Sequence, residues 1–126
     1  MAQTSKRLLI VDDNRRFAEE LRADAERLGL AVEAIHEPVG FASVVSRWKP
    51  DIIAMDLVMP DTDGLELLRA CVRHRFGGHL ILMSGGFELY LDMAQEIATR
   101  HGLRVAAKLP KPLRPKQFAY VLASLI

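Results

Sequence analysis

The sequence predicts an α/β protein with a doubly wound, five-stranded parallel sheet and helices on both faces. Two observations predict this fold. Short apolar runs bounded by turn residues recur along the 126-residue chain, and amphipathic helical patterns lie between them. A run that is apolar throughout is typical of a strand buried on both faces, as in parallel sheets. Five strand–helix units in succession favour right-handed crossovers within one sheet.

The first half of the chain alternates twice between strand and helix. The apolar run 8–11 predicts the first strand. A helix is expected next, because Gly29 stands where it would end and apolar residues recur at helical spacing at Phe17, Leu21, Ala25 and Leu28. Residues 31–35 predict a second, more polar strand, which we expect at an edge of the sheet. Residues 39–48 favour a weaker helix, since Gly40 lowers the helix propensity.

The second half repeats the alternation three times. Apolar runs at 52–55, 80–83 and 105–107 predict the remaining strands. After Gly64, apolar residues at helical spacing predict a helix; they are Leu65, Leu68 and Val72. The same spacing near the end of the chain predicts a last helix, with apolar residues at Phe118, Val121, Leu122 and Leu125. A further helix, 87–101, begins with apolar residues on nearly every side. Because a helix that covers a sheet needs only one apolar stripe, we expect part of this surface to face outward.

Composition limits the class of protein. Half of the residues are apolar and 26% are charged, which fits one globular domain over residues 1–126. The net charge of +1 gives no general attraction to nucleic acid or anionic membranes. A single cysteine, Cys71, excludes an internal disulfide, and no apolar stretch is long enough to span a membrane. We therefore expect a cytoplasmic protein with no direct contact to nucleic acid or membrane.

Reactive side chains follow four of the five predicted strands. Asp12 and Asp13 follow the first, Asp56 the third, Ser84 the fourth, and Lys111 the fifth, between two prolines. The C-terminal ends of parallel strands share one edge of the sheet, where ligands bind in open α/β folds. The sequence thus predicts three carboxylates, a hydroxyl and an ammonium at one edge.

Such a cluster of carboxylates requires a cation. Two carboxylates about 4 Å apart repel by roughly 4 kcal/mol at an effective dielectric near 20. Mg²⁺ relieves this repulsion and typically takes one or two carboxylates together with water and phosphate oxygens. Lys111 and Ser84 then offer an ammonium and a hydroxyl to a phosphoryl group. Asp56 is the candidate nucleophile, since a carboxylate can form an aspartyl-phosphate.

Each of these residues also has a purely structural interpretation. Asp12 or Asp13 alone would more often be a helix N-cap, and Asp56, Asp61 and Asp63 are typical of turns. Ser84 before two glycines and Lys111 between two prolines are common in loops. The coincidence of all four groups at strand ends favours the functional interpretation.

The chain resembles the receiver domain of two-component response regulators over residues 6–125. The matching motifs are Val11-Asp12-Asp13, residues 50–60 followed by Asp63-Gly64, Met83-Ser84-Gly85, and Lys111-Pro112. The resemblance implies a flavodoxin-like strand order, 2-1-3-4-5, as in the chemotaxis regulator.

The resemblance also implies a function. A sensor histidine kinase or phosphotransfer protein would donate a phosphoryl group from phosphohistidine to Asp56, with Mg²⁺ held by Asp12, Asp13, Asp56 and the backbone carbonyl of Val58. Ser84 and Lys111 would bind the phosphoryl group, and the Lys111-Pro112 bond would be cis. The chain would catalyse only its own phosphorylation and dephosphorylation, so we do not expect an enzyme that turns over an external substrate.

The chain departs from the family pattern at Lys108, where an aromatic residue is usual. Burying an unpaired ammonium costs several kcal/mol, so Lys108 is expected to stay at the surface, with any switch working through residues 84–88 and the next helix. A partner or homodimer contact is expected over helix 87–101 and strand 103–108. Its residues are Lys108, Phe87 and Tyr90, together with Tyr120 of the last helix. The stretch 102–113 is similar to receivers attached to cyclic-di-GMP phosphodiesterases, which suggests one output.

Two further expectations concern chemistry. In the family that the chain resembles, polar side chains at the positions of Val58 and Gly86 often tune dephosphorylation, so self-dephosphorylation is expected not to be fast here. Two other classes of protein remain as alternatives, an aspartate-nucleophile phosphatase and a flavodoxin-like FMN binder. The first usually has Asp-x-Asp after the first strand, which Asp12-Asp13-Asn14 does not match, and the second is disfavoured by carboxylates at the phosphate site.

Overall fold

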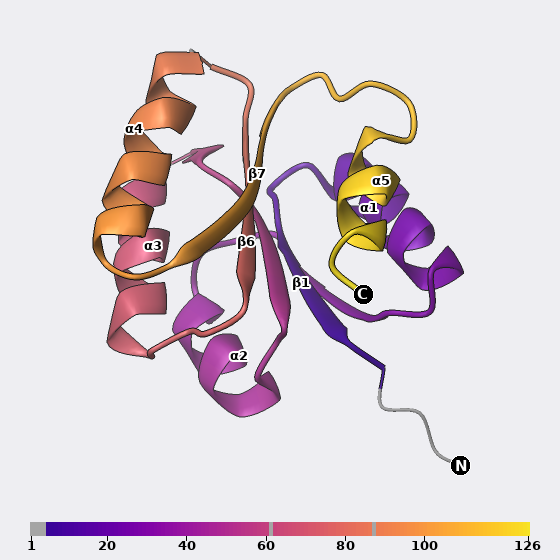
Figure 1. The fold of residues 1–126 in the computed structure, drawn as a ribbon, viewed down its shortest axis with the longest axis horizontal. Coiled ribbons are helices and arrows are strands. Elements are labelled where there is room, and N and C mark those ends of the chain that lie inside the picture. Colours follow the sequence, from indigo (N-terminus) through magenta and orange to yellow (C-terminus); the bar gives the residue numbers. More distant parts are fainter. Residues whose placement is uncertain (1–4, 61, 87) are drawn as a thin grey trace.

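A five-stranded parallel sheet lies between two layers of helices in the computed structural model, which describes residues 5–60, 62–86 and 88–126 (Figure 1). The strand order is β2-β1-β3-β6-β7. These strands are β1 (Arg7–Val11), β2 (Ala31–Ile35), β3 (Ile52–Asp56), β6 (His79–Ser84) and β7 (Arg104–Pro110). Counted along the chain, they stand in the order 2-1-3-4-5, so the expected topology is confirmed, with the more polar strand β2 at an edge.

Helices cover both faces of the sheet, as predicted. One layer consists of α2 (Phe41–Trp48), α3 (Gly64–Arg73) and α4 (Glu88–Arg100), and the other of α1 (Arg15–Arg27) and α5 (Gln117–Ala123). Figure 1 shows these two layers on opposite sides of the strands. Among the helices of the described residues, none is long and apolar enough to cross a bilayer.

Alternate residues of the central strands build two separate cores. In β1, Leu9 and Val11 face the layer of α2, α3 and α4, whereas Leu8 and Ile10 face α1 and α5. The same alternation continues through β3 and β6. Because both faces are buried, residues 8–11, 52–55 and 80–83 are all apolar, and this explains the unbroken apolar runs.

The expected elements are present, with shifted ends and one addition. The strands predicted at 8–11, 52–55, 80–83 and 105–107 each extend by one to three residues at one or both ends, and α2 begins at Phe41 rather than at residue 39. A short antiparallel hairpin, β4 (Val58–Met59) with β5 (Thr62–Asp63), was not expected from the sequence. It follows β3 directly and therefore shapes the segment after Asp56.

Gly64 fixes how this segment meets α3. A Cβ at Gly64 would lie 2.6 Å from the carbonyl oxygen of Leu57, a separation that no side chain tolerates. Asp63 is the N-cap of α3, and its Oδ1 accepts a hydrogen bond of 3.0 Å from the backbone N–H of Leu65. Asp63 thus has a structural role, but as the end of β5 and the cap of α3 rather than as the turn residue that was expected, whereas Asp61 lies outside the described residues.

Candidate functional site

Strand register brings the predicted site residues together at the C-terminal edge of the sheet. Val11 lies opposite Met55, so Asp12 and Asp56, one residue further along each chain segment, are neighbours. Ser84 lies opposite Pro110, and the backbone N–H of Lys111 donates a 2.8 Å hydrogen bond to the carbonyl oxygen of Ser84. The sheet therefore assembles all four groups from segments that are far apart in the sequence.

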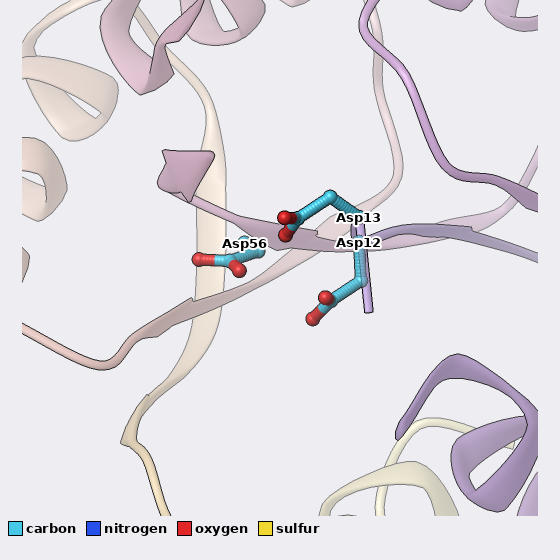
Figure 2. A group of neighbouring side chains, drawn as sticks. All are labelled: Asp12, Asp13 and Asp56. Atoms are coloured by element: carbon cyan, nitrogen blue, oxygen red, sulfur yellow. The ribbon is translucent and has the colours of Figure 1, made fainter. Parts of the chain in front are cut away.

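Three carboxylates form the acidic part of the site. One oxygen from each of Asp12, Asp13 and Asp56 lies within 4.8 Å of the others, and Figure 2 shows the three side chains gathered at the ends of their strands. Asp12 is fully buried and Asp56 is 3% exposed, whereas Asp13 is exposed. Two carboxylate charges at this separation repel by about 3 kcal/mol at an effective dielectric of about 20.

Lys111 partly compensates this negative charge. Its Nζ donates hydrogen bonds to Asp12 Oδ2 at 2.8 Å and to Asp56 Oδ2 at 3.0 Å, and it therefore bridges the two buried acids. The Lys111-Pro112 peptide bond that follows is cis, as the resemblance to receiver domains implied.

Burial and charge oppose each other at the two partners of this bridge. Burial raises the pKa of Asp56 above its usual value, and the hydrogen bonds from Val58 and Lys111 only partly reverse the effect. Burial lowers the pKa of Lys111, but its hydrogen bonds to Asp12 and Asp56 outweigh burial, so the pKa lies above the usual value. The ammonium is thus held in its charged form beside a carboxylate that is costly to ionise.

The donor set fits a hard divalent cation. Mg²⁺ prefers oxygen ligands and tolerates a partly open coordination shell completed by water, which the exposed side of Asp13 permits. No His or Cys belongs to this cluster, so the residues present do not resemble a zinc site. The carboxylates at Asp12, Asp13 and Asp56 therefore suit the ion that the sequence predicted.

Ser84 and two small neighbours border the acids. The Ser84 Oγ is buried and accepts a hydrogen bond of 3.1 Å from the backbone N–H of Gly86, so the hydroxyl can still donate its own proton. A Cβ at Gly86 would lie 3.5 Å from Ser84 Oγ and 3.9 Å from Val58 Cγ2. Positions 58 and 86 therefore face one another beside the site, and Val58, whose N–H donates to Asp56 Oδ1, is half exposed.

The N-terminus of α1 is capped by Asn14 and not by either aspartate. The Asn14 Oδ1 accepts from the backbone N–H of Phe17 at 3.0 Å, while the Asn14 N–H donates to Asp12 Oδ1 at 2.9 Å. The capping interpretation of Asp12 and Asp13 is therefore wrong. Because the Asn14 side chain accepts the hydrogen bond from the first turn of α1, both carboxylates remain directed to the site.

The residues predicted for a partner surface lie around α4, β7 and α5. Lys108 is partly exposed, and its Nζ contacts Asp92 Oδ1 at 2.7 Å, consistent with the expectation that it stays at the surface. Tyr90 donates its hydroxyl proton to Asp63 Oδ1 at 3.2 Å, and Tyr120 is 74% exposed. Leu89 and Met93 are exposed on α4, so part of its apolar surface does face outward, whereas Phe87 lies outside the described residues.

Sequence reasoning did not assign two residues that contact the predicted ones. Phe17 was assigned to a helical core face, yet its ring lies beside Lys111, with 4.4 Å between the ring centroid and Nζ. Asp92 was not assigned at all, and it pairs with Lys108. The spacing Asn14-x-x-Phe17 after the acidic pair is a signal for the first, because an N-cap fixes the residue three positions later. No local sequence pattern predicts the contact of Asp92 with Lys108.

Comparisons with known proteins agree with this geometry. Residues 8–121 match the family model described as the response regulator receiver domain. A 65-residue stretch is 38% identical to the response regulator MprA of Mycobacterium tuberculosis and covers 52% of this chain, but only 28% of that protein. The chain thus matches little more than a quarter of the length of this curated relative.

Solved structures resemble the chain over almost its whole length. A response regulator from Colwellia psychrerythraea is 35% identical, covers 97% of both chains and has a TM-score of 0.84. A response regulator protein from Burkholderia pseudomallei is 25% identical, covers 97% of this chain and 67% of its own, and has a TM-score of 0.75. That structure contains a phosphorylated aspartic acid, a calcium ion and citrate.

Proposed function

Because the chain belongs to the response regulator receiver domain family, we propose that it accepts a phosphoryl group on Asp56 as the receiving step of a two-component signalling system. The observation that carries the proposal is the bridge from Lys111 to Asp12 and Asp56 at the C-terminal edge of the sheet. An ammonium held between two buried carboxylates is suited to a ligand that is itself anionic and that replaces one of those contacts.

Each site residue has a distinct role in this proposal. Asp56 is the phosphoacceptor, Lys111 donates to one phosphoryl oxygen, and Ser84 donates its hydroxyl proton to another. Asp12, Asp13 and Asp56, with the Val58 backbone carbonyl, would hold Mg²⁺, which when bound supplies positive charge beside the phosphoryl oxygens. Phosphoryl transfer needs little beyond such positioning and neutralisation of charge.

The transfer itself exchanges one bond to phosphorus for another. An Asp56 carboxylate oxygen attacks the phosphorus of a phosphohistidine, the P–N bond breaks, and a P–O bond to Asp56 forms. The bonding electrons leave with the imidazole nitrogen, which takes up a proton. The hydrogen bond from Lys111 favours the ionised carboxylate that the attack requires, against the effect of burial.

The proposed donor is a sensor histidine kinase or a phosphotransfer protein. The phosphorylated aspartic acid in the Burkholderia pseudomallei response regulator protein supports a phosphoacceptor role for an aspartate of this chain. Because this chemistry modifies the chain itself, we do not propose turnover of an external substrate. The location in the cytoplasm stays a prediction from the sequence.

A direct test uses acetyl phosphate as a small phosphoryl donor together with Mg²⁺. We expect the mass of the chain to rise by one phosphoryl group, and we expect no rise in the Asp56→Asn variant or after chelation of the metal. Turnover of acetyl phosphate without a lasting gain of mass would favour a phosphatase instead. Absence of reaction combined with FMN binding would favour the flavin-binding alternative.

Slow self-dephosphorylation is part of the same proposal. Val58 and Gly86 border the site and offer no side chain that hydrogen-bonds a hydrolytic water. The phosphorylated chain should therefore persist for longer than seconds, and Val58→Asn should change its lifetime while Val39→Asn, at another exposed valine, should not. Loss of the phosphoryl group within seconds in the unmodified chain would contradict this.

Homodimerisation is the proposed consequence of phosphorylation. Leu89 and Met93 on α4 and Tyr120 on α5 are exposed apolar or aromatic side chains, and Lys108 on β7 pairs with Asp92 of α4. Sedimentation with and without beryllofluoride and Mg²⁺ tests this proposal. A beryllofluoride-dependent dimer that Met93→Lys abolishes supports it, and a monomer under both conditions contradicts it.

A further inference from the structure

Phe17 contacts the lysine that bridges the two buried acids of the site. Its ring belongs to the first turn of α1, and the Lys111 ammonium lies over the ring at 4.4 Å from the centroid. This separation is within the range of about 6 Å in which the negative face of an aromatic ring attracts a cation. Lys111 is therefore contacted by two carboxylates and by one aromatic ring.

The position of Phe17 is fixed by the acid cluster itself. The Asp12 carboxylate accepts from the Asn14 N–H, the Asn14 side chain accepts from the Phe17 N–H, and Phe17 contacts Lys111. Lys111 in turn donates to Asp12, which closes a ring of four contacts. A residue tied into the site at both its backbone and its side chain is placed there by more than general helix packing.

We propose that Phe17 is a positioning residue for Lys111, which holds the ammonium at the phosphoryl subsite through its aromatic face. The inference rests on the proposed function, because it concerns the residue that would bind the phosphoryl group. An aromatic ring suits this role since it attracts a cation without accepting a strong hydrogen bond. The N–H donors that Lys111 directs to Asp12 and Asp56 thus remain available to an incoming phosphoryl oxygen.

A purely structural role for Phe17 is the competing explanation. The ring is partly buried and packs against the core beneath α1 and α5, so its loss affects packing as well. The two explanations differ in what they predict for ligands. Packing does not distinguish the phosphoryl subsite from the metal ligands, whereas positioning of Lys111 acts on the phosphoryl subsite alone.

The experiment compares Phe17→Leu with Phe17→Tyr in the full chain. We expect Phe17→Leu to weaken beryllofluoride binding in the presence of saturating Mg²⁺ by about three- to thirtyfold, the range of one cation–π contact. The affinity for Mg²⁺ alone should remain within about twofold, and Phe17→Tyr, which keeps the ring, should restore beryllofluoride binding. Phe76→Leu is the matched control, because Phe76 is also partly buried but packs in the other core.

A second readout needs neither metal nor phosphoryl analogue. Protons on the Lys111 side chain near Nζ should show an upfield ring-current shift in the NMR spectrum, and Phe17→Leu should remove it. Unchanged beryllofluoride binding in Phe17→Leu, an equal loss in Phe76→Leu, or no ring-current shift in the unmodified chain would overturn the inference. If the unmodified chain binds no beryllofluoride, the proposed function fails, while the ring-current shift still tests the contact between Phe17 and Lys111.

Discussion

Two lysines three positions apart lie in very different surroundings. Lys108 on β7 faces α4, and its partly exposed side chain pairs with Asp92, which is 59% exposed. Lys111, just after β7, pairs with Asp12 and Asp56, which are buried. The N–O distances are nearly the same, 2.7 Å in the first case and 2.8 and 3.0 Å in the second.

The comparison teaches that burial, not distance, separates a surface contact from a functional one. An exposed ion pair contributes between about 0 and 1 kcal/mol, because water and salt screen both charges. Removing one partner of a buried pair costs about 3–5 kcal/mol, since the remaining charge is left without compensation. A site that holds carboxylates away from water is stable only while a cation remains there, and this makes it receptive to ligands that change its charge.

The largest expected effect comes from replacing the buried lysine. Lys111→Met should lower the free energy of unfolding by about 3 kcal/mol without Mg²⁺, because Asp12 and Asp56 then lie buried without a cation. Lys108→Met should lower it by less than about 1 kcal/mol. Urea denaturation of both variants at neutral pH measures the difference. Similar losses in the two variants would contradict the contrast between the regions.

Asp56 is expected to reduce stability at neutral pH. Burial raises its pKa in the folded chain, so the folded state binds this proton more tightly than the unfolded state. The stability that the protonated Asp56 carboxyl contributes is fully present below the pKa of the unfolded state, near 3.8. It is lost as the pH rises through the pKa of the folded state. Asp56→Asn should therefore stabilise the metal-free chain at pH 7, because the buried charge is removed while Lys111 keeps Asp12 as its partner.

This gain should depend on pH in one direction. It should shrink as the pH falls towards the unfolded pKa, where the native carboxyl is protonated in both states. Asp92→Asn is the matched control, because Asp92 is exposed and its substitution should give no gain in stability at pH 7. A stabilisation by Asp56→Asn that grows on acidification would show that the sign is wrong.

Mg²⁺ should stabilise the chain through the acidic cluster. At a free concentration ten times its dissociation constant, a ligand that binds only the folded state adds about 1.4 kcal/mol. We expect this increment in thermal or urea unfolding, and we expect Asp12→Asn and Asp13→Asn to remove most of it. Asp51→Asn, at the opposite end of the strands, should keep the increment. An equal increment in all variants would indicate weak binding elsewhere.

The sequence was more informative about the buried region than about the exposed one. Asp12, Asp56, Ser84 and Lys111 were predictable because each ends an apolar run, and parallel pairing brings such ends to one edge. The contact of Lys108 with Asp92 was not predictable, since it depends on how α4 lies against β7 and leaves no local pattern. The β4–β5 hairpin was missed for a similar reason, because two-residue strands are too short to show periodicity.

The smallest expected effect tests whether the exposed region stays as it is when the site is occupied. A double-mutant cycle of Lys108→Ala and Asp92→Asn should give a coupling energy of about 0.2–1 kcal/mol that weakens in high salt. We expect the same coupling with beryllofluoride and Mg²⁺ present, because Lys108 would lose its partner and its water by moving inward. Loss of the coupling only in the beryllofluoride-bound chain would mean that the pair breaks on activation. In that case Lys108, despite its exposure, would belong to the switch, and the contrast with Lys111 would hold only for the unphosphorylated chain.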